Sequence, residues 1–283
     1  MIAIRLGDGG QIHFAAEDVS VHDFNGDKPR IRYRKDGTER ELACDFIAGC
    51  DGFHGVCRPS IPAHVLTAHE RTYPFAWLGI LAQAPTTSEE LVYSRHEEGF
   101  ALYSMRSPEV TRLYLQCALD DDFTIWPDDR IWEQLHRRLE TDAAWRVAEG
   151  PVLERLIAPL RSFVVEPMQY GRLYLAGDAA HIVPPTGAKG MNLAIADVRL
   201  LGRALGAFYG SGRGELLEGY SAACLRRVWK VQRFSWWMTS MLHRFPDAGA
   251  FERRVQLAEL DYVTTSRAAA RTLAENYVGL PYD

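Results

Sequence analysis

Cysteine, long apolar runs and excess positive charge are all scarce in this sequence, and each scarcity argues against a class of protein. The chain has five cysteines among 283 residues, an odd number, and none has the short paired spacing of a zinc or redox motif. We therefore expect reduced, buried thiols in a cytoplasmic protein. No apolar run is long enough to span a membrane, and the N-terminus has no apolar segment of signal-peptide length. A formal net charge of -5 argues against a nucleic-acid partner.

The rest of the composition is that of a globular protein. Hydrophobic residues make up 47% of the chain and charged residues 24%, which are ordinary values for a soluble domain. A chain of 283 residues can bury one large core or form two domains.

The stretch from residue 172 to 198 is the most informative. Its apolar run at 173–176 has the length of a buried strand, and Gly177 and Asp178 end that strand. A turn rich in proline and glycine follows at 184–190. A strand, a glycine-rich loop and a helix N-terminus in this order form a site for an anionic or electron-rich ligand. The reason is that the free N–H groups and the dipole of the helix point into the loop.

From Met191 onward the apolar residues recur at helical spacing, while Arg199 and Arg203 point the other way. We predict a helix whose buried stripe is formed by Ala194, Val198, Leu201, Leu205 and Phe208.

Two interpretations of this stretch compete. It is not a P-loop, because Lys189 is followed by Gly190 where a serine or threonine would bind magnesium. The simpler alternative is an ordinary strand-to-helix connection. Against it stand the paired prolines at 184–185, and Asp178 and His181 in one short loop. The carboxyl ends of strands are where ligands bind in open α/β sheets.

Gly177-Asp178 and the segment 184–192, Pro-Pro-Thr-Gly-Ala-Lys-Gly-Met-Asn, resemble the second flavin motif of the single-component aromatic hydroxylases, and the resemblance extends to Tyr282. It implies a mixed α/β (α+β) fold, with a Rossmann-like FAD/NAD(P)-binding domain, an antiparallel β-sheet substrate domain and C-terminal helices. The expected parts are residues 1–65 and 161–208 of the FAD-binding domain, the substrate-binding sheet at 66–160, and a helical region at 209–283.

The resemblance also gives a role to the segment Asp51-Gly52 through Arg58, which follows a predicted buried strand at 46–50. Alone, an Asp-Gly pair after a strand is a common turn. In this family the segment lies beside the pyrophosphate of FAD and also serves the nicotinamide nucleotide. The residues assigned in this way are Asp51, Gly52, Arg58, Gly177, Asp178, Gly187, Gly190, Met191 and Asn192 for FAD, and His54 and Arg161 for NADPH.

Residues 66–118 are typical of an antiparallel meander, with a turn centred near residue 109. Such a turn would set Ser104 opposite Tyr114 and Arg106 opposite Arg112. Two facing cations repel, so either an anion lies between them or one points to solvent. The residues alone leave open whether Arg106 holds a carboxylate or is a solvated hairpin charge.

The resemblance assigns Ser104, Arg106 and Tyr114 to the carboxylate of 4-hydroxybenzoate. It matches Tyr93 and Tyr277 to a pair of tyrosines that relay the phenol proton, for which a tyrosine pKa of about 10 is suitable. Each tyrosine alone would be interpreted as a packing residue. Pro185 matches a residue whose carbonyl lies near the ring to be hydroxylated. The predicted substrate-binding residues are thus Tyr93, Ser104, Arg106, Tyr114 and Pro185, and the catalytic ones Tyr93, Tyr277 and Pro185.

The implied activity is hydroxylation of 4-hydroxybenzoate to 3,4-dihydroxybenzoate through a flavin hydroperoxide, in the breakdown of aromatic compounds. The implied cofactors are FAD and NADPH, with NADH possible. The expected partners are a small aromatic acid, dioxygen and a second copy in a homodimer; no nucleic acid, membrane or metal is expected.

One feature of the family is missing from the sequence. Such a hydroxylase begins with a strand, Gly-x-Gly-x-x-Gly and a helix, whereas the only early glycine cluster here, at 7–10, follows no apolar strand. The chain is expected to begin roughly a hundred residues late, about the size of a dinucleotide-binding half. Two alternatives therefore stay open: a non-catalytic remnant that binds an aromatic acid but not FAD, and a related hydroxylase acting on another phenol.

Further elements follow from periodicity and turn residues. The sequence predicts short strands at 12–14 and 19–21, a hairpin at 31–43, and helices at 131–139, 215–243 and 251–274. The stripe expected on the second of these helices is Leu216, Tyr220, Cys224 and Val228.

Overall fold

The computed structural model describes residues 1–140 and 145–281. The chain divides into two compact units. Unit 1 comprises Met1–His69, Phe163–Ile182 and Gly190–Trp229, and unit 2 comprises Glu70–Ser162, Val183–Lys189 and Lys230–Asp283. The predicted helical region extends to residue 283, and Tyr282 and the residue after it lie outside the described part. None of the helices in the described part is long and apolar enough to cross a membrane.

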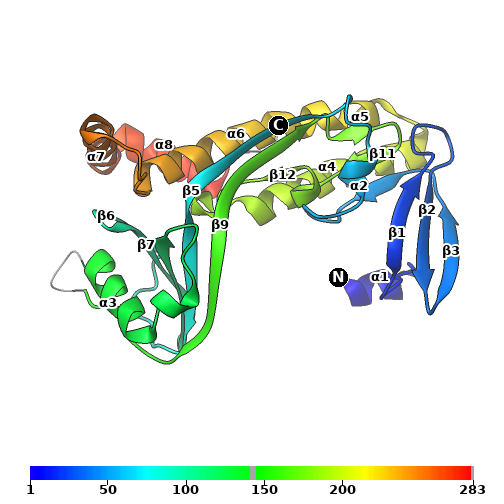
Figure 1. Ribbon diagram of the computed structural model, residues 1–283. Coiled ribbons are helices and arrows are strands. Elements are labelled where there is room, and N and C mark those ends of the chain that lie inside the picture. Colours follow the sequence, from blue (N-terminus) through cyan, green and yellow to red (C-terminus); the bar gives the residue numbers. More distant parts are fainter. Residues whose placement is uncertain (141–144, 282–283) are drawn as a thin grey trace. The chain divides into compact units, whose positions relative to one another are not determined.

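Unit 1 begins with helix α1 (Ile2–Gly7) and an antiparallel sheet of β1 (Glu17–His22), β2 (Arg30–Lys35) and β3 (Thr38–Ala43) (Figure 1). The predicted hairpin is confirmed. Asp36 and Gly37 both have positive φ values, 52° and 72°, as a two-residue turn that matches the twist of its strands requires. The predicted strand at 12–14 is wrong, because these residues pair with no described strand and Ala15 turns the backbone to a φ of 52°.

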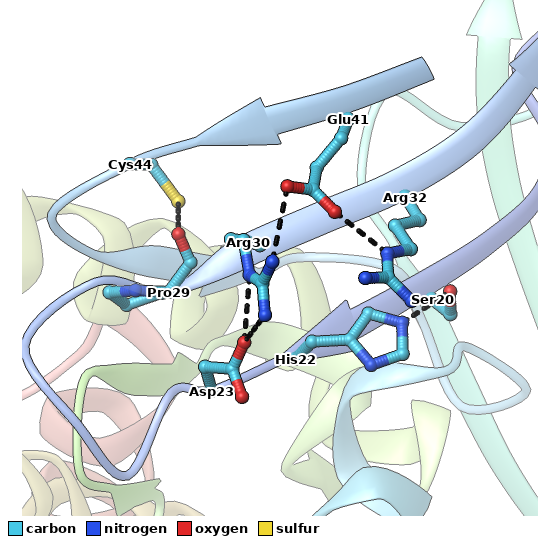
Figure 2. A network of polar contacts seen from close by, with 8 residues as sticks. All are labelled: Ser20, His22, Asp23, Pro29, Arg30, Arg32, Glu41 and Cys44. Atoms are coloured by element: carbon cyan, nitrogen blue, oxygen red, sulfur yellow. Dashed lines mark hydrogen bonds and ion pairs between the residues drawn. The ribbon is translucent and has the colours of Figure 1, made fainter. Parts of the chain in front are cut away.

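Charged side chains cover this first sheet (Figure 2). Arg30 donates to Asp23 through Nε at 2.7 Å and also contacts Glu41, which accepts from Arg32 at 2.8 Å. The Arg30 guanidinium lowers the pKa of Asp23. All four side chains are solvent-exposed, and exposed ion pairs of this kind add little to stability. The network marks a solvated face.

A second sheet of unit 1 has the order β10 (Gln169–Tyr170), β11 (Leu173–Leu175), β4 (Ile47–Gly49). Strands β4 and β11 are parallel, with Leu173 opposite Ile47 and Leu175 opposite Gly49. The predicted strands at 46–50 and 173–176 are therefore confirmed. Both are short and largely buried, and both end at the same edge of the sheet.

Helix α4 (Gly190–Ser211) follows, as predicted, but its buried face differs from the predicted one. Val198 is 53% exposed, whereas Leu193, Ala196 and Ala204 are buried with Leu201. The buried stripe therefore starts one residue before Ala194, and it includes the polar side chain of Asp197.

The helix predicted at 215–243 is two helices, α5 (Glu215–Glu218) and α6 (Tyr220–Leu242), divided at Gly219. Tyr220, Cys224 and Val228 are buried as expected. Leu216 is 49% exposed, and Leu217 is buried instead, because the break at Gly219 shifts the helical phase.

Unit 2 is built on an antiparallel sheet in the order β9 (Val152–Glu166), β5 (Thr67–Ala82), β8 (Val110–Cys117), β7 (Gly99–Ser107), β6 (Val92–His96). The predicted antiparallel sheet is confirmed, but the predicted meander holds only for β6, β7 and β8, because β5 pairs with β8. The first residues of β5 and the last residues of β9 belong to unit 1, where β9 pairs with β12 (His181–Ile182).

The predicted register of the β7–β8 hairpin is wrong. Ser104 lies opposite Arg112, and Tyr114 lies opposite Leu102. The register shifts between Met105 and Ser107, so Arg106 is the extra residue of a β-bulge and no cation faces it across the ladder. The predicted Arg106–Arg112 repulsion therefore does not arise.

Each face of this sheet has its own apolar core. One face packs Leu78, Leu113 and Leu115 against helix α3 (Asp128–Leu139), which follows the short helix η1 (Phe123–Ile125). The opposite face packs aromatic residues against the end of α6 and against α7 (Ala250–Thr265) and α8 (Arg267–Val278). The residues of this aromatic face include Tyr73, Phe75, Trp77 and Phe100, with Tyr93, Tyr114 and Tyr277 packed beside them.

Helices α7 and α8 replace the single helix predicted at 251–274. Ser266 between them has extended backbone (φ -87°, ψ 117°), and its side chain accepts from the N–H of Ala269. A serine that caps a new helix in this way ends the preceding one.

Candidate functional site

The two predicted flavin motifs lie side by side in unit 1. Asp51-Gly52 follows β4 and Gly177-Asp178 follows β11, and these strands are parallel neighbours. The N–H of Ala176 donates to the Gly49 carbonyl at 3.0 Å, which continues the ladder to the point where both strands end. This common edge is where a parallel sheet holds ligands.

Arg58 ties the two motifs together. Its guanidinium donates to the carbonyls of Phe53 at 2.6 Å and of Ala179 at 3.1 Å. It also lies over the rings of Phe53 and Phe163, at 4.4 and 4.8 Å. In the described contacts Arg58 braces the loops through two carbonyls and lies close to both rings, which are themselves in edge contact at 5.2 Å; this agrees with the rigid donor geometry of arginine.

Asp51 shapes its own loop. Its Oδ2 accepts from the N–H of Cys57 at 2.8 Å, at the start of α2 (Cys57–Ser60). A Cβ on Gly55 would lie 2.1 Å from the Asp51 carboxyl carbon, and Gly52 has a φ of 75°. The loop therefore needs glycine at both positions.

Gly177 is required at the end of β11. Its φ is 63°, and a Cβ there would lie 3.1 Å from the Cβ of Ala194 on α4. It begins the short helix η2 (Gly177–Ala179), which places Asp178 on the surface. Asp178 makes no side-chain hydrogen bond or ion pair with any residue of the described part of the chain. Its carboxylate is thus available to accept from the hydroxyl groups of a ligand.

A buried pair that the sequence did not reveal supports this motif from behind. Oδ2 of Asp197 accepts from the Gly177 N–H at 3.0 Å and lies 2.6 Å from Nε2 of His181. Both side chains are only 2% exposed. One feature of the sequence could have indicated this pair: Asp197 is an acidic residue among the apolar residues of α4.

The N-terminal turn of α4 carries the three remaining predicted flavin residues of unit 1. Gly190 is half-buried, while Met191 and Asn192 are exposed. The first turn of α4 contains no acidic residue, so its positive end is not compensated from within the helix. The N–H groups of this turn can donate to the phosphates and the electron-rich ring of FAD, and the carboxylate of Asp178 can accept from its hydroxyl groups. The glycines at 52 and 177 allow close approach of the backbone, so together these groups fit FAD.

The two residues predicted to contact NADPH lie in different units. His54 in unit 1 is exposed, with its ring 5.1 Å from that of Phe53. Arg161 in unit 2 lies on β9, and its Nη1 is 3.9 Å from a carboxylate oxygen of Glu70. Both side chains reach solvent.

Three of the predicted substrate residues of unit 2, Tyr93, Ser104 and Tyr114, share one face of the sheet; Arg106 lies in the bulge and Pro185 in a loop outside the sheet. In the register of the sheet, Tyr93 lies opposite Leu102, Leu102 opposite Tyr114, and Tyr114 opposite Gly79. These four residues form one row across β6, β7, β8 and β5. A Cβ on Gly79 would lie 3.2 Å from the Tyr114 ring, so glycine makes room for that ring.

Tyr93 and Tyr277, which are 184 positions apart, are in direct contact. Their hydroxyl oxygens lie 3.1 Å apart, and the Tyr93 hydroxyl donates to the Thr186 carbonyl at 3.0 Å. Because a carbonyl only accepts, the single proton of Tyr93 points to Thr186, and Tyr277 donates to Tyr93. Burial raises the pKa of Tyr93 far above its usual value. Tyr93 therefore stays protonated while it is part of this chain of hydroxyls.

The loop that carries Thr186 is held from several sides. Pro185 is exposed at the start of helix η3 (Pro185–Gly187), and a Cβ on Gly187 would lie 2.8 Å from Oγ of Ser235. Lys189 is only 6% exposed. Its ammonium donates to the Tyr277 carbonyl, and burial lowers its pKa.

The sequence pattern did not assign Thr186 and Lys189 to this site. The one feature that could have indicated a buried role for Lys189 is that it has no acidic residue beside it in the sequence.

The hairpin of β7 and β8 carries two arginines that differ in exposure and in ion pairing. Arg112 is 16% exposed, lies 3.9 Å from Glu154, and stacks over the Tyr114 ring at 5.4 Å. Arg106 is exposed in the bulge and makes no ion pair within the described residues. Ser104 is half-buried beside it and faces Arg112.

The structure thus brings most of the predicted residues together in two sets. Unit 1 gathers the flavin motifs, and unit 2 gathers the tyrosines, the loop of Pro185 and the Ser104–Arg106 strand. Over the described ranges 1–140 and 145–281, no group of three or more histidine, cysteine or acidic side chains could hold a metal ion.

Comparison with known proteins places the chain among flavoproteins. A family described as an FAD binding domain matches residues 2–235. Over 270 residues the chain is 51% identical to the p-hydroxybenzoate hydroxylase of Acinetobacter baylyi, covering 95% of this chain and 67% of that protein. It is 25% identical over 236 residues to the aklavinone 12-hydroxylase DnrF of Streptomyces peucetius, covering 78% of this chain and 46% of that protein.

Solved structures agree on the fold. The p-nitrophenol 4-monooxygenase PnpA from Pseudomonas putida matches with a TM-score of 0.70 at 17% identity, over 94% of this chain and 67% of that one. Aklavinone-11 hydroxylase in complex with FAD and aklavinone matches with a TM-score of 0.69 at 21% identity, over 86% of this chain and 46% of that one. The expected fold, a mixed α/β flavoprotein hydroxylase fold with antiparallel sheets and C-terminal helices, is confirmed.

Proposed function

The chain belongs to the FAD-binding family of flavin-dependent aromatic hydroxylases, and from that premise we propose that it hydroxylates 4-hydroxybenzoate at position 3. The product would be 3,4-dihydroxybenzoate, and the co-substrates would be NADPH, or NADH, and dioxygen. The observation that carries this proposal lies in unit 2, where Tyr93 hydrogen-bonds Tyr277 and Thr186. Tyr93 also shares a row of the sheet with Tyr114.

Within unit 1, the residues proposed to hold FAD are those gathered at the strand ends. Asp178 would accept from hydroxyl groups of the cofactor, and the N-terminal turn of α4 would favour negative charge on it. Gly52 and Gly177 would let the backbone approach closely. Bound and reduced, the flavin supplies the chemistry that activates dioxygen and delivers one oxygen atom to the aromatic ring.

The carboxylate of the substrate is proposed to meet Ser104, Arg106 and Tyr114. Of the two arginines on this hairpin, Arg112 is already engaged by Glu154 and by the Tyr114 ring. Arg106 is the cation without an ion pair among the described residues, so its guanidinium can take a new carboxylate. Charge-assisted hydrogen bonds of this kind are the strong ones in recognition.

The phenol of the substrate is proposed to give its proton to the chain of hydroxyls. Loss of that proton makes the ring richer in electrons and more reactive toward an electrophilic oxygen atom. A tyrosine and a phenol have similar pKa values, so the proton passes between them at little cost. The exposed Pro185 lies next to Thr186 in the same loop, where its carbonyl could orient the ring.

Two further parts of the proposal concern the surroundings of the enzyme. All five cysteines are free, which suits the reducing cytoplasm where NADPH is available. We also propose that two copies associate as a homodimer, which sedimentation of the purified chain would test.

Removal of the Arg106 guanidinium tests the substrate assignment. Arg106→Ala should weaken 4-hydroxybenzoate binding about tenfold or more, because it removes a charge-assisted hydrogen bond of roughly 1.5–3 kcal/mol. Binding would be measured by calorimetry on the purified chain. Phenol, which has no carboxylate, should bind the variant and the unaltered chain alike.

Arg137→Ala provides the matched control. Arg137 is also an exposed arginine of unit 2, but it lies on α3 and pairs with Glu98 and Glu133. Its loss should leave binding unchanged. Equal affinity of Arg106→Ala and the unaltered chain for 4-hydroxybenzoate would refute the assignment and favour a phenol without a carboxylate.

A further inference from the structure

His243 is a fully buried histidine that the proposed chemistry does not use. His243 is the first residue after α6, which ends at Leu242, and the exposed fraction of its side chain is 0%. Its ring is stacked on Phe75 at 4.7 Å with an interplanar angle of 4°, and on Phe100 at 4.4 Å with an angle of 27°. A polar ring in such an aromatic stack is costly to bury unless both of its nitrogens have partners.

Both nitrogens do have partners, and these partners fix one tautomer. Nδ1 lies 3.0 Å from the Thr239 carbonyl, which can only accept, so Nδ1 carries the proton. Nε2 lies 2.6 Å from Nε1 of Trp77, whose indole can only donate, so Nε2 carries none. The ring is therefore the neutral Nδ1–H form, and burial acts in the same direction, lowering the pKa of His243 to about 3.

The two partners of His243 lead to the two halves of the proposed substrate site. On one side, the Trp77 ring packs 4.9 Å from the Tyr114 ring. On the other side, the Thr239 hydroxyl lies 2.9 Å from the Thr186 hydroxyl. The carbonyl of Thr186 accepts the hydroxyl proton of Tyr93. All of these residues belong to unit 2.

We propose that His243 is a positioning residue for the aromatic acid. Its acceptor nitrogen holds the Trp77 indole at the angle that supports Tyr114, and its donor nitrogen fixes the turn of α6 that carries Thr239 and so supports the Thr186 loop. It touches neither substrate nor cofactor. This inference rests on the proposed function, because it concerns the site in which Tyr93 and Tyr114 would bind the substrate.

His243→Phe is the direct test, since phenylalanine keeps a flat ring in the stack and removes both hydrogen bonds. It leaves the buried N–H of Trp77 without an acceptor. We expect 4-hydroxybenzoate to bind the purified full chain about tenfold more weakly, as measured by calorimetry, which corresponds to roughly 1.4 kcal/mol. Trp77→Phe removes the other partner of the same hydrogen bond, so it should also weaken binding, and the losses of the two variants should not add in the double variant.

Leu135→Ala controls for a merely structural role. Leu135 belongs to the core on the opposite face of the same sheet, and its truncation should lower the melting temperature without changing the affinity. A His243→Phe variant that loses stability but keeps its affinity would overturn the proposal, as would a double variant in which the losses of the two single variants add.

Two measurements keep the proposal testable if His243→Phe does not fold. Thr239→Val keeps the carbonyl that His243 contacts but removes the hydroxyl beside Thr186, and it should also weaken binding; unchanged affinity would contradict the proposal. In the unaltered chain, ¹⁵N NMR of labelled histidine should show a protonated Nδ1 and a bare Nε2, and any other form would overturn it. If the unaltered chain binds no 4-hydroxybenzoate while this tautomer is present, the proposed function fails and the tautomer of His243 stands.

Discussion

Tyr93 is the residue on which the proposed proton transfer depends. Burial raises its pKa far above the usual value, so it does not ionise at physiological pH. A tyrosine in this state moves a proton only by accepting one while it passes its own on. As the hydroxyls are now arranged, Tyr277 donates to Tyr93 and Tyr93 to Thr186, so both must turn for the proton of a phenol to move outward.

Replacing Tyr277 by phenylalanine should interrupt this transfer and little else. Its ring packs against the aromatic face and the Lys189 contact is to its backbone carbonyl, so both survive. We expect hydroxylation to slow by about a hundredfold, at the lower end of the range for proton-transfer groups, while FAD binding is unchanged. Rapid-mixing kinetics and a flavin titration would separate the two.

Tyr262→Phe is the control for this change, because Tyr262 is an exposed tyrosine of α7. It should leave both quantities unaltered. An equal loss of FAD binding and of rate in Tyr277→Phe would show that Tyr277 is structural and would refute its role in the relay.

At the scale of single elements, the connection from β11 to α4 carries the flavin site of unit 1. Gly177 ends the strand at a φ of 63° and lies against Ala194 of the helix, while Asp197 of the same helix accepts its N–H. Strand and helix are thus locked together at the point where Asp178 projects. The position of that carboxylate depends on a glycine that any side chain would disturb.

Gly177→Ala should therefore destabilise unit 1 and weaken FAD binding together. The left-handed backbone costs an alanine roughly 1–2 kcal/mol, and its Cβ would also press on Ala194. Gly202→Ala is the matched control, since Gly202 lies in the middle of α4 and a Cβ there meets nothing within 4 Å. It should stabilise the helix by up to about 1 kcal/mol. Thermal unfolding and FAD titration of both variants would test this, and equal behaviour of the two would contradict it.

Much at this scale was predictable from the sequence. The turn residues at 36 and 37, the apolar runs before Asp51 and Gly177, and the helical period after Met191 all led to the observed elements. They did so because each depends on local chemistry. The proximity of the two flavin motifs also follows, once both are assigned to the ends of parallel strands.

What could not be predicted depends on details without a local signal. The turn between Ser107 and Val110 would by itself set Ser104 opposite Leu113, and the β-bulge moves it one position further, to Arg112. The alternation of side chains along a strand gives no sign of one inserted residue. The inner face of α4 was missed by one position because it buries a charged residue, Asp197. His243 gave no signal at all, since its role arises only from the rings that surround it.

At the scale of the whole molecule, the proposed activity draws on residues from both units. Unit 1 carries Asp178 and the start of α4, and unit 2 carries Gly187, Pro185 and the tyrosines. The chain covers 67% of the p-hydroxybenzoate hydroxylase that it resembles at 51% identity. The central claim is therefore that these residues suffice to bind FAD and an aromatic acid in the same molecule.

The most direct test is a titration of the purified 283-residue chain with FAD, followed by addition of 4-hydroxybenzoate, with flavin fluorescence and absorbance recorded throughout. We expect saturable FAD binding and a change in the flavin spectrum on adding the acid. With 4-hydroxybenzyl alcohol, which lacks the carboxylate, we expect no such change. A folded chain that binds no FAD, or that binds it with no response to the acid, would contradict the proposed function.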